Sequence, residues 1–181
     1  MEAYEGLLHD RAPTLGLISP ADLPRVRGRH ILDSLRARAA FRGEDRDAAD
    51  IGSGAGLPGL ALAIALPAVR FVLVEPRRAR AGFLELAVER LHLSNVEVFV
   101  GRAQELQMDF DVATARAFAP IDEAWRAAAP ILRPGGRLIY FAGSAEAAAL
   151  ARSLVAPQAP SAVEIQGGIA NRLPLVIMAR G

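Results

Sequence analysis

Short apolar runs alternate with longer amphipathic stretches from residue 47 onward. Five of the runs are mostly apolar and end in charged or turn residues, which is typical of buried parallel strands. Two later runs are separated by a short glycine-containing connection, which favours an antiparallel hairpin. The expected strands are residues 47–51, 70–75, 96–101, 110–114, 136–141, 162–167 and 173–180.

The stretches between these runs predict helices that cover the faces of a sheet. Alternation of strands and helices is typical of an α/β fold with a mostly parallel sheet. The expected helices are residues 57–66, 78–93, 121–132 and 145–155, with a short helical piece at 104–107.

The first 46 residues show no strand pattern. Asp22 can cap a helix that has Pro24 in its first turn, and this helix would run through His30 to about Phe41. We expect residues 1–46 to form a helical lid packed on the core and residues 47–181 to form the main α/β domain. The chain would then be one domain overall.

Composition agrees with a globular domain, since 52% of the 181 residues are hydrophobic and 23% are charged. The absence of cysteine excludes a thiolate zinc site, an iron–sulfur cluster and a cysteine nucleophile. The longest apolar run is too short to span a membrane, and the acidic start is unlike a secretory signal. We therefore expect a cytoplasmic monomer that binds neither membrane nor metal.

Positive charge gathers in one window, because residues 25–46 carry seven arginines against Asp33, Glu44 and Asp45. Arginines in such a cluster can neutralise the phosphates of a nucleic acid. A solvated helical face explains the charge alone equally well. The candidates for nucleic-acid contact are Arg25, Arg27, Arg29, Arg36, Arg38, Arg77 and Arg80.

A glycine-rich loop follows the first strand, where residues 50–59 read DIGSGAGLPG. Glycines allow a sharp turn and a close approach of backbone to ligand, and the start of the next helix offers free N–H groups. Glu75 ends the second strand, where a carboxylate can accept hydrogen bonds from ribose hydroxyls. Together these features predict a nucleotide-like ligand.

A dinucleotide-binding oxidoreductase is one alternative, because residues 54–59 match GxGxxG. Asp50 stands just before the loop, where its charge would repel a pyrophosphate but would suit a cationic amino group. The final hairpin also departs from a plain doubly wound sheet. Both details favour a different nucleotide-like ligand.

Several motifs resemble class I S-adenosylmethionine-dependent methyltransferases, namely DxGxGxG at residues 50–56, Glu75, and LRPGG at residues 132–136. More narrowly, RHILDSL at residues 29–35, the loop through Pro58 and Gly59, and RAFA at residues 116–119 resemble the ribosomal RNA small subunit methyltransferase G family. The resemblance implies a Rossmann-like, seven-stranded, mostly parallel sheet with a reversed last strand and flanking helices. It also implies methyl transfer from S-adenosylmethionine to N7 of a single guanine in 16S ribosomal RNA, with that RNA or the small ribosomal subunit as partner.

The resemblance also assigns residues to a site. The glycines would pass beside the methionine part of the cofactor with Asp50 near its amino group, and Glu75 would hold the ribose. Ser34 would border the methyl-transfer cleft. The expected cofactor-binding residues are Asp50, Gly52, Ser53, Gly54, Gly56, Leu57, Pro58, Glu75, Ala103, Gln104 and Arg116, and the expected catalytic residues bordering the cleft are Arg116, His30 and Asp33.

The implied chemistry needs few groups, because N7 of guanine carries an unprotonated lone pair at neutral pH and alignment supplies most of the acceleration. Residues 115–118 read ARAF, whereas methyltransferases of exocyclic amines resemble one another in an Asn/Asp-Pro-Pro-aromatic motif. Arg116 is predicted to bind a cofactor carboxylate or an RNA phosphate, or to form a surface ion pair. Phe118 is predicted either to stack on the target base or to pack in the core, and Trp125 to pack in the core.

The chain departs from the family pattern at two places that concern RNA docking. Gly16 and Leu17 stand where the family has an Asn-Leu pair, and Ala142 and Gly143 stand where many relatives have Lys-Gly. We expect Arg25, Arg27, Arg36 and Arg38 to replace the missing basic contacts. Three other functions stay open: a methyltransferase for a small molecule or another RNA, a non-catalytic RNA-binding protein with a retained cofactor pocket, and the dinucleotide-binding oxidoreductase.

Overall fold

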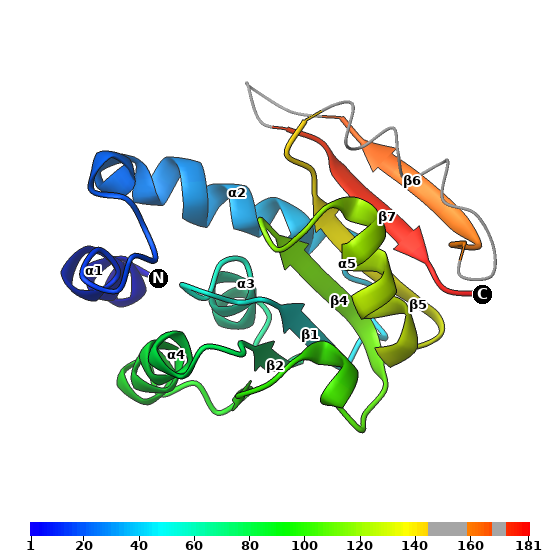
Figure 1. Ribbon diagram of the computed structural model, residues 1–181, viewed down its shortest axis with the longest axis horizontal. Coiled ribbons are helices and arrows are strands. Elements are labelled where there is room, and N and C mark those ends of the chain that lie inside the picture. Colours follow the sequence, from blue (N-terminus) through cyan, green and yellow to red (C-terminus); the bar gives the residue numbers. More distant parts are fainter. Residues whose placement is uncertain (145–158, 168–172) are drawn as a thin grey trace.

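The computed structural model describes residues 1–144, 159–167 and 173–181, and shows one twisted sheet with helices on both faces (Figure 1). The sheet has seven strands in the order β3-β2-β1-β4-β5-β7-β6. β7 is antiparallel to both of its neighbours, and the pairs among β1 to β5 are parallel. The predicted mostly parallel sheet with a reversed last strand is therefore confirmed. The strands are β1 Asp47–Ile51, β2 Arg70–Val74, β3 Val96–Phe99, β4 Phe110–Arg116, β5 Leu132–Phe141, β6 Ala162–Gln166 and β7 Leu175–Ala179.

Two central strands are longer than the sequence predicts. β4 continues to Arg116 rather than ending at residue 114, and β5 begins at Leu132 rather than at residue 136. The early start of β5 includes a shift of register against β4 between Phe110 and Val112. Gly135, with φ +77°, lies inside this irregular stretch, which explains why the sequence pattern predicts a strand only from residue 136.

The helices of the α/β part lie close to their predicted places. They are α3 Gly59–Ala65, α4 Arg78–Arg90 and α5 Ile121–Ala128, with single 3-10 turns at Ala103–Glu105 and Ala129–Ile131. The expected helix at 78–93 ends early because His92 adopts the left-handed conformation, with φ +52°. The helix expected at 145–155 lies wholly outside the described residues. The connection expected at 167–172 also lies outside them, except for residue 167.

The N-terminal segment is helical but differs from the prediction in detail. An additional helix, α1 (Glu2–Arg11), precedes it, and the predicted cap at Asp22 is wrong because the turns begin directly after Ser19. Turns of changing pitch then continue to Ala40, including α2. The successive turns are Pro20–Arg25 (3-10), Val26–Ile31 (π), α2 Leu32–Leu35 and Arg36–Ala40 (3-10).

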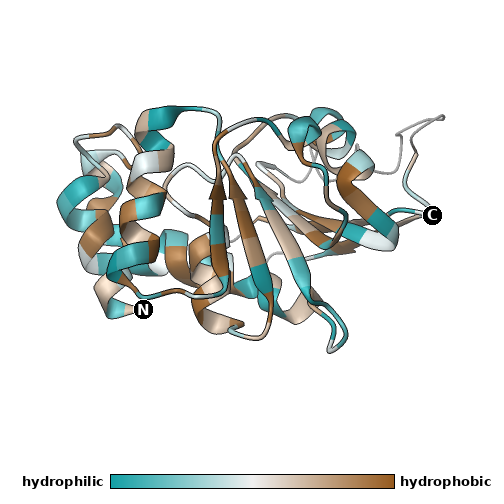
Figure 2. Ribbon diagram, turned by 90° about the horizontal axis from the view of Figure 1, so that it is seen from below, coloured by the Kyte–Doolittle hydropathy of each residue, from teal (hydrophilic) through white to brown (hydrophobic). Residues whose placement is uncertain are grey.

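Two apolar clusters lie on the opposite faces of the sheet, and Figure 2 shows the apolar strands between the helical layers. On one face, Tyr4 and Ile31 of the N-terminal segment share a cluster with Leu60 of α3 and Phe71 of β2. On the other face, α5 packs on the sheet through Trp125, which is buried as predicted. Burial of such apolar surface supplies the main driving force for folding.

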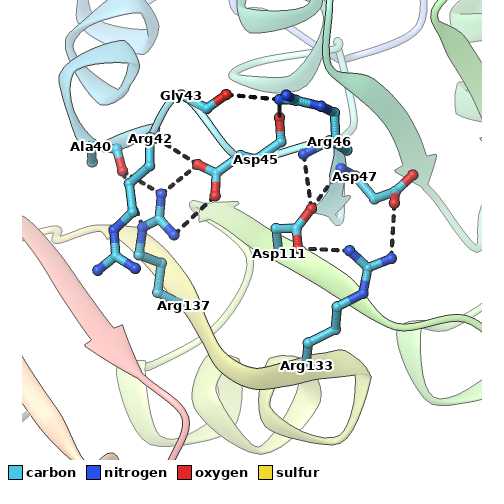
Figure 3. Close-up of polar contacts among 9 residues, drawn as sticks. All are labelled: Ala40, Arg42, Gly43, Asp45, Arg46, Asp47, Asp111, Arg133 and Arg137. Atoms are coloured by element: carbon cyan, nitrogen blue, oxygen red, sulfur yellow. Dashed lines mark hydrogen bonds and ion pairs between the residues drawn. The ribbon is translucent and has the colours of Figure 1, made fainter.

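A polar network fastens the amino-terminal edge of the central strands (Figure 3). Arg137 of β5 is buried and forms a forked ion pair with the buried carboxylate of Asp45, at 2.5 and 3.2 Å. The same guanidinium donates to the Ala40 carbonyl at 2.8 Å. Nearby, the Asp111 carboxylate of β4 accepts from Arg133 and from the backbone N–H groups of Arg46 and Asp47. The network joins the end of the N-terminal segment to the sheet.

We expect Asp45→Ala to lower the free energy of unfolding by about 3–5 kcal/mol, because it leaves the guanidinium of Arg137 buried without its carboxylate. Urea denaturation followed by circular dichroism measures the change. The matched control is Asp122→Ala, which breaks the exposed pair with Arg126 and should cost no more than about 1 kcal/mol. Equal losses in the two variants would contradict this view of the network.

Candidate functional site

The loop between β1 and α3 is shaped by glycines in the left-handed region. Gly52, Gly54 and Gly56 have φ of +72°, +55° and +84°, which other residues rarely adopt. A Cβ at Gly52 would lie 2.6 Å from Cδ2 of Phe118, so a side chain there would collide with the ring. The loop therefore presents bare backbone at the carboxyl end of β1.

Asp50 supports this loop through buried hydrogen bonds to β4 and α3. Its carboxylate is buried and accepts from the Thr114 hydroxyl of β4 at 2.7 Å and from the Gly59 N–H of α3 at 3.0 Å. Burial raises the pKa of Asp50, while the bonds from Thr114, Ser53 and Gly59 act in the opposite direction. Asp50 thus joins two strands and a helix. Its proximity to a ligand's amino group stays a prediction.

Glu75 stabilises the loop through a hydrogen bond from the backbone of Gly54. It directly follows β2, is buried, and accepts from the backbone N–H groups of Gly54 at 3.1 Å and Arg77 at 2.9 Å. Its neighbours Val74 and Pro76 line a pocket beside the loop. The two predicted acidic residues therefore meet at the same glycine loop, and the ribose contact of Glu75 stays a prediction.

Three pockets lie beside one another along this edge of the sheet, and we name each after one lining residue. The Gln104 pocket, about 470 Å³, shares Gly52 with the His30 pocket, about 260 Å³. The His30 pocket in turn shares Arg116 and Ala117 with the Tyr140 cleft, about 680 Å³. The three pockets therefore adjoin one another, and the glycine loop contributes to the walls of two of them.

Some of the predicted site residues line these pockets, and others are buried beneath the glycine loop. Gly52, Ser53, Gly54 and Leu57 line the His30 pocket, and Ala103 and Gln104 line the Gln104 pocket. The buried Asp50, Gly56, Pro58 and Glu75 support the loop from within. Phe118 is 40% exposed and lines the Gln104 pocket, so the predicted alternative of core packing is wrong.

Arg116 joins the sheet to the N-terminal segment. Its guanidinium donates to the His30 carbonyl and the Ser34 hydroxyl, each at 3.0 Å, and lies 3.8 Å from an Asp33 carboxylate oxygen. It also lies over the Phe141 ring, 5.8 Å from the centroid, in a cation–π arrangement. Arg116 is therefore a half-buried hub, and the predicted alternative of a surface ion pair is wrong.

His30 and Asp33 both meet Arg116. Nδ1 of His30 lies 2.9 Å from the guanidinium, and Asp33 accepts from Arg36 at 2.8 Å. Among the described residues no hydrogen bond joins His30 to Asp33 directly, so the contact between them passes through Arg116. Burial, followed by the charge of Arg116, lowers the pKa of His30, which is therefore neutral at neutral pH.

The family model for rRNA small subunit methyltransferase G matches residues 1–166. The chain belongs to the rRNA small subunit methyltransferase G family. Curated relatives of this name include proteins from Salinispora arenicola, 42% identical over 154 residues, and from Thermobifida fusca, 39% identical over 168 residues. These alignments cover 80% and 91% of this chain but 63% and 70% of the two relatives. The chain thus spans about two thirds of their length.

Solved structures of methyltransferases share the fold. A methyltransferase from Pyrococcus furiosus aligns with a TM-score of 0.63 at 17% identity, covering 83% of each chain. A precorrin-6y C5,15-methyltransferase from Geobacter metallireducens aligns with a TM-score of 0.59 at 19% identity, covering 91% of this chain and 90% of the other. At these identities the likeness establishes the Rossmann-like fold that the methyltransferase G motifs implied.

The arginines predicted to bind RNA are in three different situations. Arg27 and Arg29 are exposed but paired with Glu5 and Asp22, which reduces the positive field they offer. Arg36 is largely buried, and donates to Asp33 and to the Leu173 carbonyl. In the described part of the chain the guanidinium groups of the remaining four form no ion pair or hydrogen bond, and these are Arg25, Arg38, Arg77 and Arg80.

The two departures from the methyltransferase G pattern lie beside the pockets. Gly16 has φ +61°, a left-handed conformation that both Gly and Asn adopt readily. Glycine in place of the Asn of the family pattern is therefore compatible with this backbone conformation. Leu17 lines the His30 pocket. Ala142 and Gly143 line the Tyr140 cleft. At this second departure the wall of the cleft carries no side-chain charge.

Sequence reasoning missed three polar groups that complete the site. The hydroxyl of Tyr4 donates to the Ala55 carbonyl of the loop at 2.8 Å, Thr114 binds Asp50, and the Tyr140 hydroxyl donates to the Ala119 carbonyl at 3.0 Å. Thr114 is a polar residue between two alanines in the buried middle of β4, which is a usable signal. Tyr4 offered none, because its partner is 51 residues away.

No cluster of side chains that could hold a metal ion occurs in the part of the chain that the structure describes. Within the same residues no helix has the length and apolar character needed to cross a membrane.

We expect His30 to make folding stability decrease as the pH falls through the ordinary histidine pKa of about 6.5. The unfolded state has the ordinary histidine pKa of about 6.5, whereas the folded state has a lower one. The unfolded state therefore binds a proton first as the pH falls, and the free energy of unfolding decreases below about pH 7. Urea denaturation across this range should show a smaller decrease in His30→Gln, whose amide oxygen can still accept from Arg116.

The matched control for this prediction is His9→Gln on α1, which removes an exposed histidine and should keep the pH dependence of the parent protein. An unchanged pH dependence in His30→Gln would contradict the neutral, buried state of this ring.

Proposed function

We propose that this chain is an S-adenosylmethionine-dependent methyltransferase that modifies N7 of a single guanine in 16S ribosomal RNA, in the cytoplasm. The observation that carries the proposal is the row of three adjoining pockets at the glycine loop, with Arg116 and Ala117 shared by the His30 pocket and the Tyr140 cleft. Membership of the methyltransferase G family supports the choice of ribosomal RNA. N7 of guanine carries a lone pair and needs no general base, which agrees with a cleft whose polar side chains are already engaged.

The pockets fit the cofactor in shape and polarity. Ile51, Val74, Ala103 and Phe118 give the Gln104 pocket apolar walls that suit a flat purine ring. Gly52 lines both this pocket and the His30 pocket, and a Cβ there would collide with the ring of Phe118 in the wall of the Gln104 pocket. S-adenosylmethionine supplies a methyl group on a sulfonium when bound. Glu75 and the loop would hold the ribose and the methionine part.

The Tyr140 cleft would receive the target guanine, and its polar side chains are already engaged. Asp33 is bound by Arg36 and lies beside Arg116, so its carboxylate is held as an ion pair. Tyr140 donates to the Ala119 carbonyl, and burial, followed by Asp122, raises the pKa of its hydroxyl. The cleft thus offers positioning rather than a free base, which suits an acceptor atom that carries a lone pair without deprotonation.

Arg116 would position the reacting groups indirectly. Its bonds to residues 29, 30 and 34 hold the N-terminal segment over the border between the His30 pocket and the Tyr140 cleft. Ala117 has φ +51°, a strained conformation for a residue other than glycine, and it turns the chain between Arg116 and Phe118. This covering would limit the access of water to the site of transfer.

The test is transfer of labelled methyl from S-adenosylmethionine to small ribosomal subunits, and to their naked RNA, prepared without this modification. We expect label at N7 of one guanine, located by base mapping. Glu75→Ala should lose at least about tenfold in cofactor affinity and a corresponding share of transfer at low cofactor concentration, because it removes the ribose acceptor. The matched control is Glu85→Ala, which lies exposed on α4 and should behave like the parent.

Label on a small molecule from a metabolite extract, with none on either RNA substrate, would overturn the choice of acceptor. Salt-dependent binding of RNA without any transfer would favour a non-catalytic RNA-binding protein. Cofactor affinity that is unchanged in Glu75→Ala would refute the ribose contact.

A further inference from the structure

Two residues that line the His30 pocket carry a side-chain hydrogen-bond donor that has no acceptor among the described residues. The glycine loop forms one wall, the N-terminal segment forms another, and Arg80 of α4 completes the lining. At about 260 Å³ it is the smallest of the three pockets, and Arg116 separates it from the Tyr140 cleft. A pocket of this size holds one part of a nucleotide-like ligand rather than the whole of it.

Arg80 is the first of these donors. It lies in the first turn of α4 and is partly buried, and in the described part of the chain its guanidinium has neither an ion pair nor a hydrogen bond. Arg27 and Arg29, which are more exposed, each have a carboxylate partner. A cation withdrawn from water is stabilised by an anion, and guanidinium groups match carboxylates particularly well.

His30 provides the second donor. A guanidinium group can only donate, so Nδ1 of His30 must accept from Arg116, and the proton of the neutral ring then lies on Nε2. Nε2 is buried and has no partner among the described residues. A buried donor without an acceptor is costly, and an acceptor that enters the pocket would remove this cost.

The one carboxylate among the residues lining the pocket is already engaged. Asp22 accepts from Arg29 at 2.9 Å and from the Ser19 hydroxyl at 3.2 Å. Its charge is balanced by Arg29, so Arg80 keeps an uncompensated charge beside the loop. The pocket as a whole therefore attracts an anion.

We propose that Arg80 and the Nε2–H of His30 together bind the terminal carboxylate of the cofactor's amino-acid part. This inference rests on the proposed function, which brings the methionine part of S-adenosylmethionine into the same pocket. It gives Arg80 a different role from the RNA contact expected from the charge pattern, because Arg80 faces a small pocket at the loop while Arg77 is exposed outside it.

The experiment compares two ligands that differ in the amino-acid part. S-adenosylhomocysteine carries the carboxylate, and 5′-methylthioadenosine keeps the adenosine and sulfur but lacks it. Calorimetric titration of Arg80→Gln should show affinity for S-adenosylhomocysteine lowered about tenfold to hundredfold, and affinity for 5′-methylthioadenosine within about twofold of the parent. His30→Phe should show the same selective loss, and Arg80→Lys a smaller one.

The matched control is Arg78→Gln, which removes the same charge from the same helical turn at an exposed position outside the pocket. It should leave both affinities unchanged. Equal losses for both ligands in Arg80→Gln would overturn the proposal and indicate a structural role, and so would an unchanged affinity for S-adenosylhomocysteine. A loss confined to RNA binding would return Arg80 to the RNA surface. Failure of the parent protein to bind either ligand would instead refute the proposed function, on which the inference depends.

Discussion

The buried carboxylate of Asp50 is the constraint on which the site depends. It stands at the end of a central strand, and its two oxygens hold the neighbouring strand through Thr114 and the start of α3 through Gly59. A Cβ at Gly59 would lie 2.6 Å from one of these oxygens, so the helix approaches this closely only because the residue is glycine. With both ends fixed, the loop between them takes a conformation that exposes its backbone.

The N-terminal segment supplies the other half of the site. Tyr4 reaches the loop through the Ala55 carbonyl, and Arg116 reaches back from the sheet to residues 29–34. These contacts connect parts of the chain that are far apart in sequence, and they enclose the His30 pocket between segment and loop. Both walls are needed for the pocket to exist, so the segment forms part of the site as well as part of the core.

Local patterns were enough to predict most of the sheet and the place of the loop. Apolar runs mark buried strands because both faces of a parallel sheet are covered. The glycines at positions 52, 54 and 56 mark a left-handed backbone conformation that other residues rarely adopt. The Asp22 cap was wrong because the helical turns begin three residues earlier, and Asp22 binds Ser19 and Arg29 instead. The bonds of Arg116 and Tyr4 depend on tertiary packing, which no local pattern records.

The position of β7 has a consequence for how the sheet is assembled. β7 pairs with β5 on one side and with β6 on the other, so among the described strands β6 is attached to the sheet through β7, which follows it in sequence. β6 therefore cannot join the sheet until β7 pairs with β5, although β6 and β7 can first pair with each other as a hairpin. Folding cannot proceed strand by strand in chain order at this edge, and loss of residues 175–179 would release two strands rather than one.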